Sequence, residues 1–161
     1  MTGAVTMEIR EILAPQAVAA HQRATSKKQL FQEIGARASD TYRFDGRGVF
    51  EALLDRERLG STAMGRGVAA PHARLSDCAS IRGVFLRLEK PIPFDAMDDE
   101  PVDLVFALLA PENAGADHLR ALAKVSRVLR DPAICAKLRS CADGTAIYSV
   151  LTDTTSSTRA A

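Results

Sequence analysis

The chain is poor in the residues on which several large protein classes depend. It has no tryptophan, three cysteines and three histidines in 161 residues, and its formal net charge is only +1. Proteins that bind nucleic acid through its phosphates usually carry a strongly basic face, so this balance argues against that class. The cysteines form no C-x-x-C pair, and they are Cys78, Cys135 and Cys141. Their odd number predicts reduced thiols in a cytoplasmic protein.

Long apolar runs are also missing. No run reaches the roughly 18 apolar residues that cross a bilayer, so we expect no membrane insertion. Residues 1–7 (MTGAVTM) lack the basic region and apolar core of a secretory signal. The composition, 47% hydrophobic and 25% charged, is that of an ordinary globular protein. A domain of about 150 residues buries roughly 68–70% of its unfolded surface, so a single core is expected to be sufficient.

Helical and strand patterns occur along the whole chain. Ser26 with Gln29 forms a capping box before a first helix, and Asp131 followed by proline opens a later one. The segment 102–109 (VDLVFALL) is apolar on both faces, which is typical of a central strand. The other expected elements are a helix after Asp45, a strand over 81–88, a helix capped by Asp117 that buries Leu119, Leu122, Val125 and Leu129, and a short last helix around 147–151.

Helices before, between and after strands predict an α/β sandwich in a single domain. We expect a central mixed β-sheet with helices on both faces. The domain is predicted to cover residues 7–151. Residues 152–161 (TDTTSSTRAA) are small and polar without apolar periodicity, so we expect them to form a disordered tail.

Most common catalytic patterns are absent. Gly60 and Gly65 have Walker A spacing, but Arg66 and Gly67 follow where Lys and Ser/Thr are needed. The acidic stretch 95–100 fits no EF-hand template, which leaves a solvated turn as its interpretation. No H-x-x-x-H or G-x-S-x-G pattern occurs. Spacing alone leaves a Cys–His pair open, although no cysteine lies in a context that favours the thiolate. The sequence thus predicts neither a metal nor a bound cofactor.

His72 is the strongest candidate for chemistry. It follows Pro71, whose fixed φ stiffens the chain, and Gly65 and Gly67, which let a backbone approach a ligand closely. Imidazole titrates near neutral pH, so a neutral nucleophilic nitrogen is available. The alternative is that His72 is a loop histidine without a function. For His118 the alternative is a polar residue of a first helical turn, and His21 is given no role.

Two blocks of sequence resemble a known family. The first block is Arg56-Glu57, then 59–62 (LGST) and 65–74 (GRGVAAPHAR), and the second is 101–106 (PVDLVF) followed by Pro111-Glu112 and His118-Leu119. Together they resemble the type-2 enzyme IIA domains of the bacterial phosphoenolpyruvate phosphotransferase system. The resemblance covers about residues 7–151.

The resemblance implies a role for three residues. His72 matches the family's phosphoryl acceptor, which takes its phosphate from a phosphohistidine protein of the HPr or NPr type. His118 matches the second histidine of the site, and Arg56 the arginine that faces the phosphoryl group. These roles agree with the chemistry, because phosphoryl transfer needs in-line positioning and neutralisation of the phosphoryl oxygens. A phosphohistidine donor is already activated, so neither nucleotide nor magnesium is required.

The start of the chain is similar to the nitrogen-regulatory branch of this family. The similar residues are Ile9, Ile12-Leu13, Pro15 and 26–30 (SKKQL). The leading hypothesis is therefore a regulatory phosphocarrier that acts on protein targets through its phosphorylation state. The alternatives are a sugar-transport component that passes phosphate to an enzyme IIB, and a binding module that is not phosphorylated. One departure is Ala63, where the family commonly has glycine. Alanine resists positive φ, so the loop beside His72 is expected to differ slightly.

Overall fold

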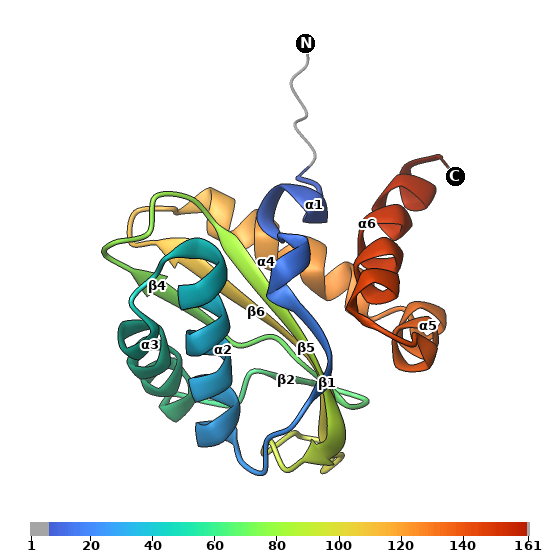
Figure 1. Ribbon diagram of the computed structural model, residues 1–161, viewed down its shortest axis with the longest axis horizontal. Coiled ribbons are helices and arrows are strands. Elements are labelled where there is room, and N and C mark those ends of the chain that lie inside the picture. Colours follow the sequence, from blue (N-terminus) through green and yellow to red (C-terminus); the bar gives the residue numbers. More distant parts are fainter. Residues whose placement is uncertain (1–6, 161) are drawn as a thin grey trace.

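The computed structural model describes the backbone of residues 7–160 and the side chains of residues 7–153, which build one six-stranded mixed sheet with flanking helices (Figure 1). None of the described helices is long and apolar enough to cross a membrane. The elements are α1 (Ile9–Ile12), the 3-10 turn η1 (Pro15–Ala17), β1 (Val18–Gln22), α2 (Lys27–Tyr42), α3 (Gly46–Arg58), β2 (Ala63–Gly65), β3 (Val68–Ala69), β4 (His72–Leu75), β5 (Arg82–Ile92), β6 (Val102–Pro111), α4 (Ala116–Leu129), α5 (Pro132–Ser140) and α6 (Gly144–Ala160).

The sheet is centred on β5 and β6. Its order is β1-β5-β6-β3-β2, with β1 parallel to β5, β5 antiparallel to β6, and β2 antiparallel to β3. Both β3 and β4 run parallel to the same side of β6, where Val68 is opposite Leu104 and His72 is opposite Leu108. They share one position beside β6, interrupted at Ala70 and Pro71, and β2 pairs with the other side of β3. Proline cannot donate to the ladder, but its carbonyl still accepts from the Leu108 amide at 2.9 Å.

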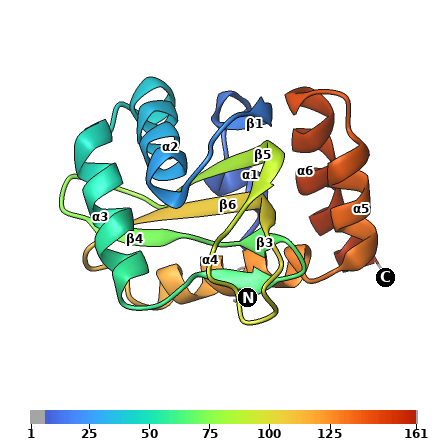
Figure 2. The same ribbon diagram turned by 90° about the horizontal axis from the view of Figure 1, so that it is seen from below.

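Helices cover the sheet on both sides. Figure 2 shows α2 and α4 on opposite sides of the strands, with α3 along β4 and with α5 and α6 at the β1 end. The predicted central strand is confirmed, since all but the second and last residues of β6 are buried. Phe106 on β6 and Phe85 on β5 meet edge to face at 6.0 Å within this core. The predicted sandwich with a mixed sheet is therefore correct.

Two helix starts follow the sequence signals. Ser26 accepts a hydrogen bond from the Gln29 amide at 3.1 Å, and Asp131 accepts one from the Ala133 amide at 2.9 Å. The prediction for α4 was wrong by two residues, because Gly115 and not Asp117 is the N-cap. The buried face of α4 also differs from the predicted one. His118 is 5% exposed and Leu119 is 65% exposed, whereas the sequence pattern placed Leu119 in the core.

Several short elements were not foreseen. Strand β1, with the sequence VAAHQ, lacks a strong period-2 pattern and is held by parallel pairing with β5. Strand β4 begins directly after Pro71, a position at which no strand was expected. Helix α6 extends to Ala160 and so includes most of the segment expected to be a tail. Side chains beyond Asp153 lie outside the described residues, and the domain boundary at Leu151 stays a prediction.

Candidate functional site

The three residues singled out from the sequence lie together in one hollow beside the interrupted sheet edge. His72 comes from the start of β4, Arg56 from the last turn of α3 and His118 from the first turn of α4. The hollow has a volume of about 360 Å³. Its lining residues are Ala52, Arg56, His72, Ala73, Arg74, His118, Leu119 and Leu122. The two imidazole rings are 5.5 Å apart between centroids and lie edge to face, with an angle of 69° between their planes.

The orientation of the His72 ring defines its tautomer. Its Nδ1 lies 3.0 Å from the carbonyl oxygen of Ala70, two residues earlier in the chain. A carbonyl can only accept, so Nδ1 carries the hydrogen and donates it. In the neutral ring the lone pair is then on Nε2. The nitrogen able to attack an electrophile is therefore Nε2, while Nδ1 is held by the backbone.

Burial keeps this imidazole neutral. The pKa of His72 is lowered first by desolvation and further by the nearby positive charges of Arg56 and Arg74. The Ala70 hydrogen bond and the Glu57 carboxylate oppose this shift, and burial prevails. A histidine with a lowered pKa is unprotonated at neutral pH and keeps its nucleophilic lone pair.

His118 is the more deeply buried of the two histidines. Burial lowers its pKa, and the neighbouring His72 and Arg74 lower it further. Its Nδ1 is buried and has no hydrogen-bond partner among the described side chains and backbone. A buried nitrogen without a hydrogen-bond partner destabilises the folded protein, because it has lost its hydrogen bonds to water. Such nitrogens are often found where the protein makes a functional contact. His118 also stands in the first turn of α4, where the positive end of the helix dipole favours an anion.

Arg56 is anchored at the end of its own helix. Its Nη1 donates to the carbonyl oxygen of Gly60 at 2.9 Å, which satisfies one of the free carbonyls after the last turn of α3. The guanidinium therefore stays at the rim of the hollow. A guanidinium held in this way can donate further N–H groups to a phosphoryl or carboxylate oxygen.

A buried carboxylate next to Arg56 had received no role from the sequence. Glu57 is 8% exposed and accepts hydrogen bonds from the Thr62 amide at 3.1 Å, the Thr62 hydroxyl at 2.7 Å and the Lys27 ammonium at 2.9 Å. Lys27 also pairs with Asp95 at 2.9 Å. A signal was present, because Glu57 follows the buried Leu53 by four positions and so falls on the apolar face of α3.

The glycine segment does not line the hollow, contrary to the sequence interpretation. Gly65 and Gly67 have φ of 92° and 81° and form the β2–β3 turn, opposite the start of β6. The positive φ of Gly67 favours glycine there, and a Cβ would also displace the Arg139 guanidinium, which would be 2.6 Å away. The departure at Ala63 is also explained. Ala63 lies in β2 and does not have a positive φ, so alanine fits without strain.

The remaining candidates are structural. The acidic stretch forms the expected turn, in which Asp98 accepts from the amides of Arg66 and Glu100 at 2.8 and 3.1 Å. Within residues 7–153, no group of three His, Cys, Asp or Glu side chains could hold a metal ion. The described cysteines are free thiols.

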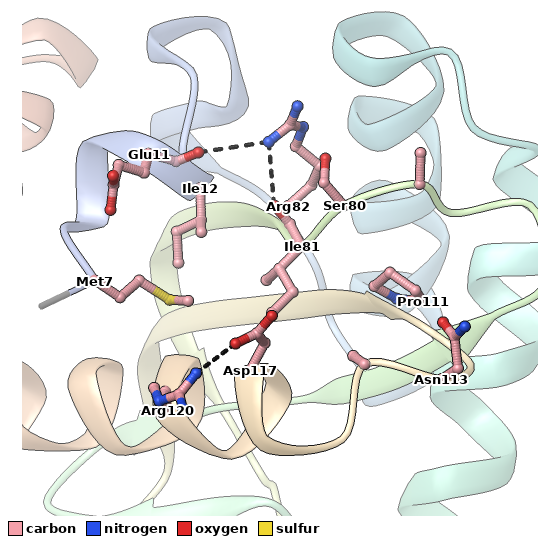
Figure 3. Close-up of a pocket in the computed structure, with 12 residues that line it drawn as sticks. Met7, Glu11, Ile12, Ser80, Ile81, Arg82, Pro111, Asn113, Asp117 and Arg120 are labelled. Carbon is pink, nitrogen blue, oxygen red and sulfur yellow. Dashed lines mark hydrogen bonds and ion pairs between the residues drawn. The ribbon is translucent and has the colours of Figure 1, made fainter. Parts of the chain in front are cut away.

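A second hollow, of about 540 Å³, lies between α1, the start of β5 and α4, and contains none of the three candidates (Figure 3). Its charged groups are engaged with the protein itself. Arg82 donates to the carbonyl oxygens of Glu11 and Ile81 at 3.4 and 3.2 Å, and Arg120 pairs with Asp117. These internal contacts leave the hollow beside β4 as the better candidate site.

This combination of fold and site belongs to a recognised class of phosphotransferase-system domains. Residues 11–154 match the family described as phosphoenolpyruvate-dependent sugar phosphotransferase system, EIIA 2, and the chain is a member of it. It is 53% identical over 145 residues to a nitrogen regulatory protein of Bradyrhizobium diazoefficiens, which covers 90% of this chain and 95% of that protein. The nitrogen regulatory protein of Escherichia coli is 39% identical over 150 residues, or 92% of each chain.

Solved structures agree with this assignment. The crystal structure of the nitrogen regulatory protein IIA-Ntr from Neisseria meningitidis superposes with a TM-score of 0.84 at 38% identity, covering 89% of this chain and 99% of that one. The mannitol IIA of Escherichia coli has a TM-score of 0.73 at 20% identity, covering 86% and 97%. The second likeness is one of fold alone.

Proposed function

We propose that this protein is a regulatory phosphocarrier that accepts a phosphoryl group on Nε2 of His72 from a phosphohistidine protein of the HPr or NPr type. The observation that carries the proposal is the hydrogen bond from Nδ1 of His72 to the Ala70 carbonyl. That bond leaves the Nε2 lone pair free in the same hollow as Arg56 and His118. Membership of the EIIA type-2 family supports the same chemistry.

The transfer exchanges one nitrogen–phosphorus bond for another. The Nε2 lone pair attacks the phosphorus, the donor's nitrogen–phosphorus bond breaks, and the leaving imidazole keeps the electron pair. Nδ1 of His72 retains its proton throughout. The acceptor nitrogen has to be unprotonated, and the lowered pKa of His72 meets that requirement.

The charge of the phosphoryl group is the main electrostatic demand on the site. Arg56 is suited to donate to its oxygens, and His118 to accept or donate one further hydrogen bond from its buried ring. The first turn of α4 adds the positive end of a helix dipole. Arg56, His72 and His118 line the same hollow in the unphosphorylated protein, which supports a transfer with little reorganisation.

A regulatory function agrees best with the names of the similar proteins. The full-length similarity is to proteins named nitrogen regulatory protein, at 53% and 39% identity. Phosphohistidine adds up to about two negative charges where a neutral ring stood, beside exposed apolar side chains such as Leu119. A change of this size can create or abolish a protein interface, and we infer that partner binding depends on it.

The test is phosphorylation from phosphoenolpyruvate through enzyme I and an HPr-type carrier. Intact mass at neutral pH should show one added phosphate that mild acid removes, since phosphohistidine is acid-labile. His72→Gln should abolish the gain and His21→Gln, on the surface of β1, should not. A His72→Gln protein that still gains the phosphate contradicts the proposal, and a wild-type protein that gains none favours the non-phosphorylated binding module.

A second experiment tests whether the phosphorylated protein has a regulatory or a sugar-transport function. Phosphorylated protein is mixed with an enzyme IIB, and the retained phosphate is followed by mass. Retention of the phosphate, with different affinities of the two forms for a regulatory target, supports the regulatory function. Rapid transfer to the IIB protein with equal target binding would replace it by the sugar-transport function.

A further inference from the structure

We propose that Glu57 and Thr62 are positioning residues that fix the tautomer of His72 through the Ala70 carbonyl, so that Nε2 rather than Nδ1 is the phosphoryl acceptor. The proposal rests on the proposed function of His72. It assigns a task to a buried ionic network that the resemblance to the family left without one.

The network begins with a buried charge. Glu57 is 8% exposed on the inner face of the last turn of α3 and accepts three hydrogen bonds. Two come from Thr62, through its amide and its hydroxyl, and the third from Lys27 at the start of α2. The hydrogen bond between the Glu57 carboxylate and the Lys27 ammonium is charge-assisted, and such bonds are short and directional. Thr62 is therefore held at two atoms.

Thr62 connects Glu57 to the sheet through a backbone hydrogen bond. Its carbonyl oxygen accepts from the Ala70 amide at 3.0 Å, next to the pairing of Ala63 with Ala69 between β2 and β3. Ala70 directly precedes Pro71, which has no N–H with which to fix this part of the edge. The residue before the proline is thus held at its amide by Thr62, which Glu57 holds in turn, and the backbone of Ala70 carries this restraint to its own carbonyl.

The last step reaches the imidazole. The Ala70 carbonyl oxygen accepts from Nδ1 of His72 at 3.0 Å. A hydrogen bond makes each contact from Glu57 to the ring: Glu57 to Thr62, Thr62 to Ala70, and Ala70 to His72. If Thr62 is released, the Ala70 carbonyl loses its fixed direction. The ring then gains access to the other tautomer, in which Nε2 carries the hydrogen and cannot attack phosphorus.

Arg56 shares the same segment. It donates to Gly60 while Glu57 accepts from Thr62, so the adjacent Arg-Glu pair holds both ends of the connection between α3 and β2. Glu57 could also act on His72 by charge alone, since its carboxylate raises the pKa of that ring. Thr62→Val separates the two effects, because it removes one hydrogen bond to Glu57 and leaves the charge in place.

The experiment measures the tautomer directly in the unphosphorylated protein. Nitrogen-15 shifts of the imidazoles, recorded at pH 8 where the rings are neutral, report the ratio of the Nδ1–H to the Nε2–H form. We expect Thr62→Val and Glu57→Gln to lower this ratio at His72 by roughly 2- to 10-fold, the effect of one net hydrogen bond, and Thr62→Ser to restore it. The rate of phosphate uptake should fall in Thr62→Val and recover in Thr62→Ser.

The control is Asp55→Asn, which removes an exposed partner of Arg58 on the same helix turn and should change neither readout. An unchanged ratio in folded Thr62→Val, whether or not uptake slows, overturns the proposal. If Glu57→Gln does not fold, the Thr62 pair decides alone. The NMR measurement needs no phosphate, so the two proposals can fail separately. If the wild type is never phosphorylated but Thr62→Val still changes the tautomer ratio of His72, the proposed function is refuted and the positioning role of Thr62 stands.

Discussion

At the scale of single residues, the three histidines have different pKa shifts because their surroundings differ. Of the three histidines, His72 and His118 are in the hollow and have lowered pKa values because they are buried. His21 is on the surface, and both of its ring nitrogens face acceptors, Glu89 at 2.9 Å and the Ala142 carbonyl at 3.0 Å. The Glu89 hydrogen bond raises the pKa of His21. The surroundings therefore shift the pKa of one residue type in opposite directions.

One NMR titration tests the order of the three histidine pKa values. Relative to the usual imidazole pKa of about 6.5, we expect His21 to titrate above that value and His72 and His118 below it. As pH falls through 6.5, His72 should stay neutral and able to accept phosphate. The Cε1–H shift of each ring, assigned with single His→Gln variants, provides the measurement. A His72 that protonates before His21 would refute the assignment of burial as the dominant cause.

Arg56 should matter for transfer far more than its neighbour on the helix. If the proposed function holds, replacing Arg56 by Ala should remove charge-assisted hydrogen bonds to the phosphoryl oxygens, each worth about 1.5–3 kcal/mol, so the initial rate of phosphate uptake should fall by roughly 10- to 150-fold. Arg58, in the same last turn, is exposed and paired with Asp55, and Arg58→Ala is the matched control. Equal rates for the two variants would remove Arg56 from the site.

At the scale of elements, the packing of α2 on α3 sets where Arg56 stands. The two helices meet at Gly35 and Gly46, and a Cβ added at Gly35 would be 2.4 Å from the carbonyl oxygen of Gly46. No side chain is tolerated there, because the obstacle is backbone. The close approach holds α3, and with it Arg56 and Glu57, against β4.

Gly35→Ala should therefore destabilise the protein even though alanine is the better helix former. Overpacking costs about 1–3 kcal/mol, against a gain of about 1 kcal/mol in helix propensity. Since the obstacle at Gly35 is backbone, the cost should lie at the upper end, and urea unfolding should show a net loss of up to about 2 kcal/mol. Gly48→Ala on α3 is the control, since its Cβ would meet only the exposed Asp45 side chain at 3.1 Å. A stabilised Gly35→Ala protein would contradict this packing argument.

At the scale of the whole molecule, the histidines link stability to pH with opposite signs. A histidine whose folded pKa is lowered binds more protons when unfolded, so its contribution to stability is lost as pH falls below about 6.5. His72 and His118 are of this kind. His21, with a raised pKa, stabilises the fold below the unfolded pKa and loses that contribution as pH rises through its folded pKa.

Replacing one buried histidine should flatten the pH dependence. We expect the unfolding free energy of His118→Gln to fall less between pH 7.5 and 5 than that of the wild type, because the protonation that favours the unfolded chain is gone. His21→Gln should fall more steeply than the wild type over the same range. Urea denaturation at several pH values measures both slopes. Parallel curves for wild type and His118→Gln would show that His118 protonates alike in both states.

Local patterns were sufficient for most of the fold and for singling out His72, whereas the roles expected for Arg56 and His118 came from the resemblance to the family. The buried strand β6 and the caps at Ser26 and Asp131 depend on neighbours within a few positions, and such interactions are written in the sequence. His72 was found for its Pro-His context and from a resemblance that covers nearly the whole chain. The family assignment needed nothing beyond the sequence.

Tertiary structure decided what no local pattern contains. The strand β4 exists because β6 offers it a parallel partner after Pro71, and β1 because β5 does. The face of α4 that is buried, and hence the burial of His118 in place of Leu119, follows from how the helix lies on the sheet. The tautomer of His72 depends on a carbonyl whose direction is held through Thr62 by Glu57. Hydrogen bonds between residues distant in the chain form only once the core has brought them together, so the reactive nitrogen was beyond the reach of the sequence alone.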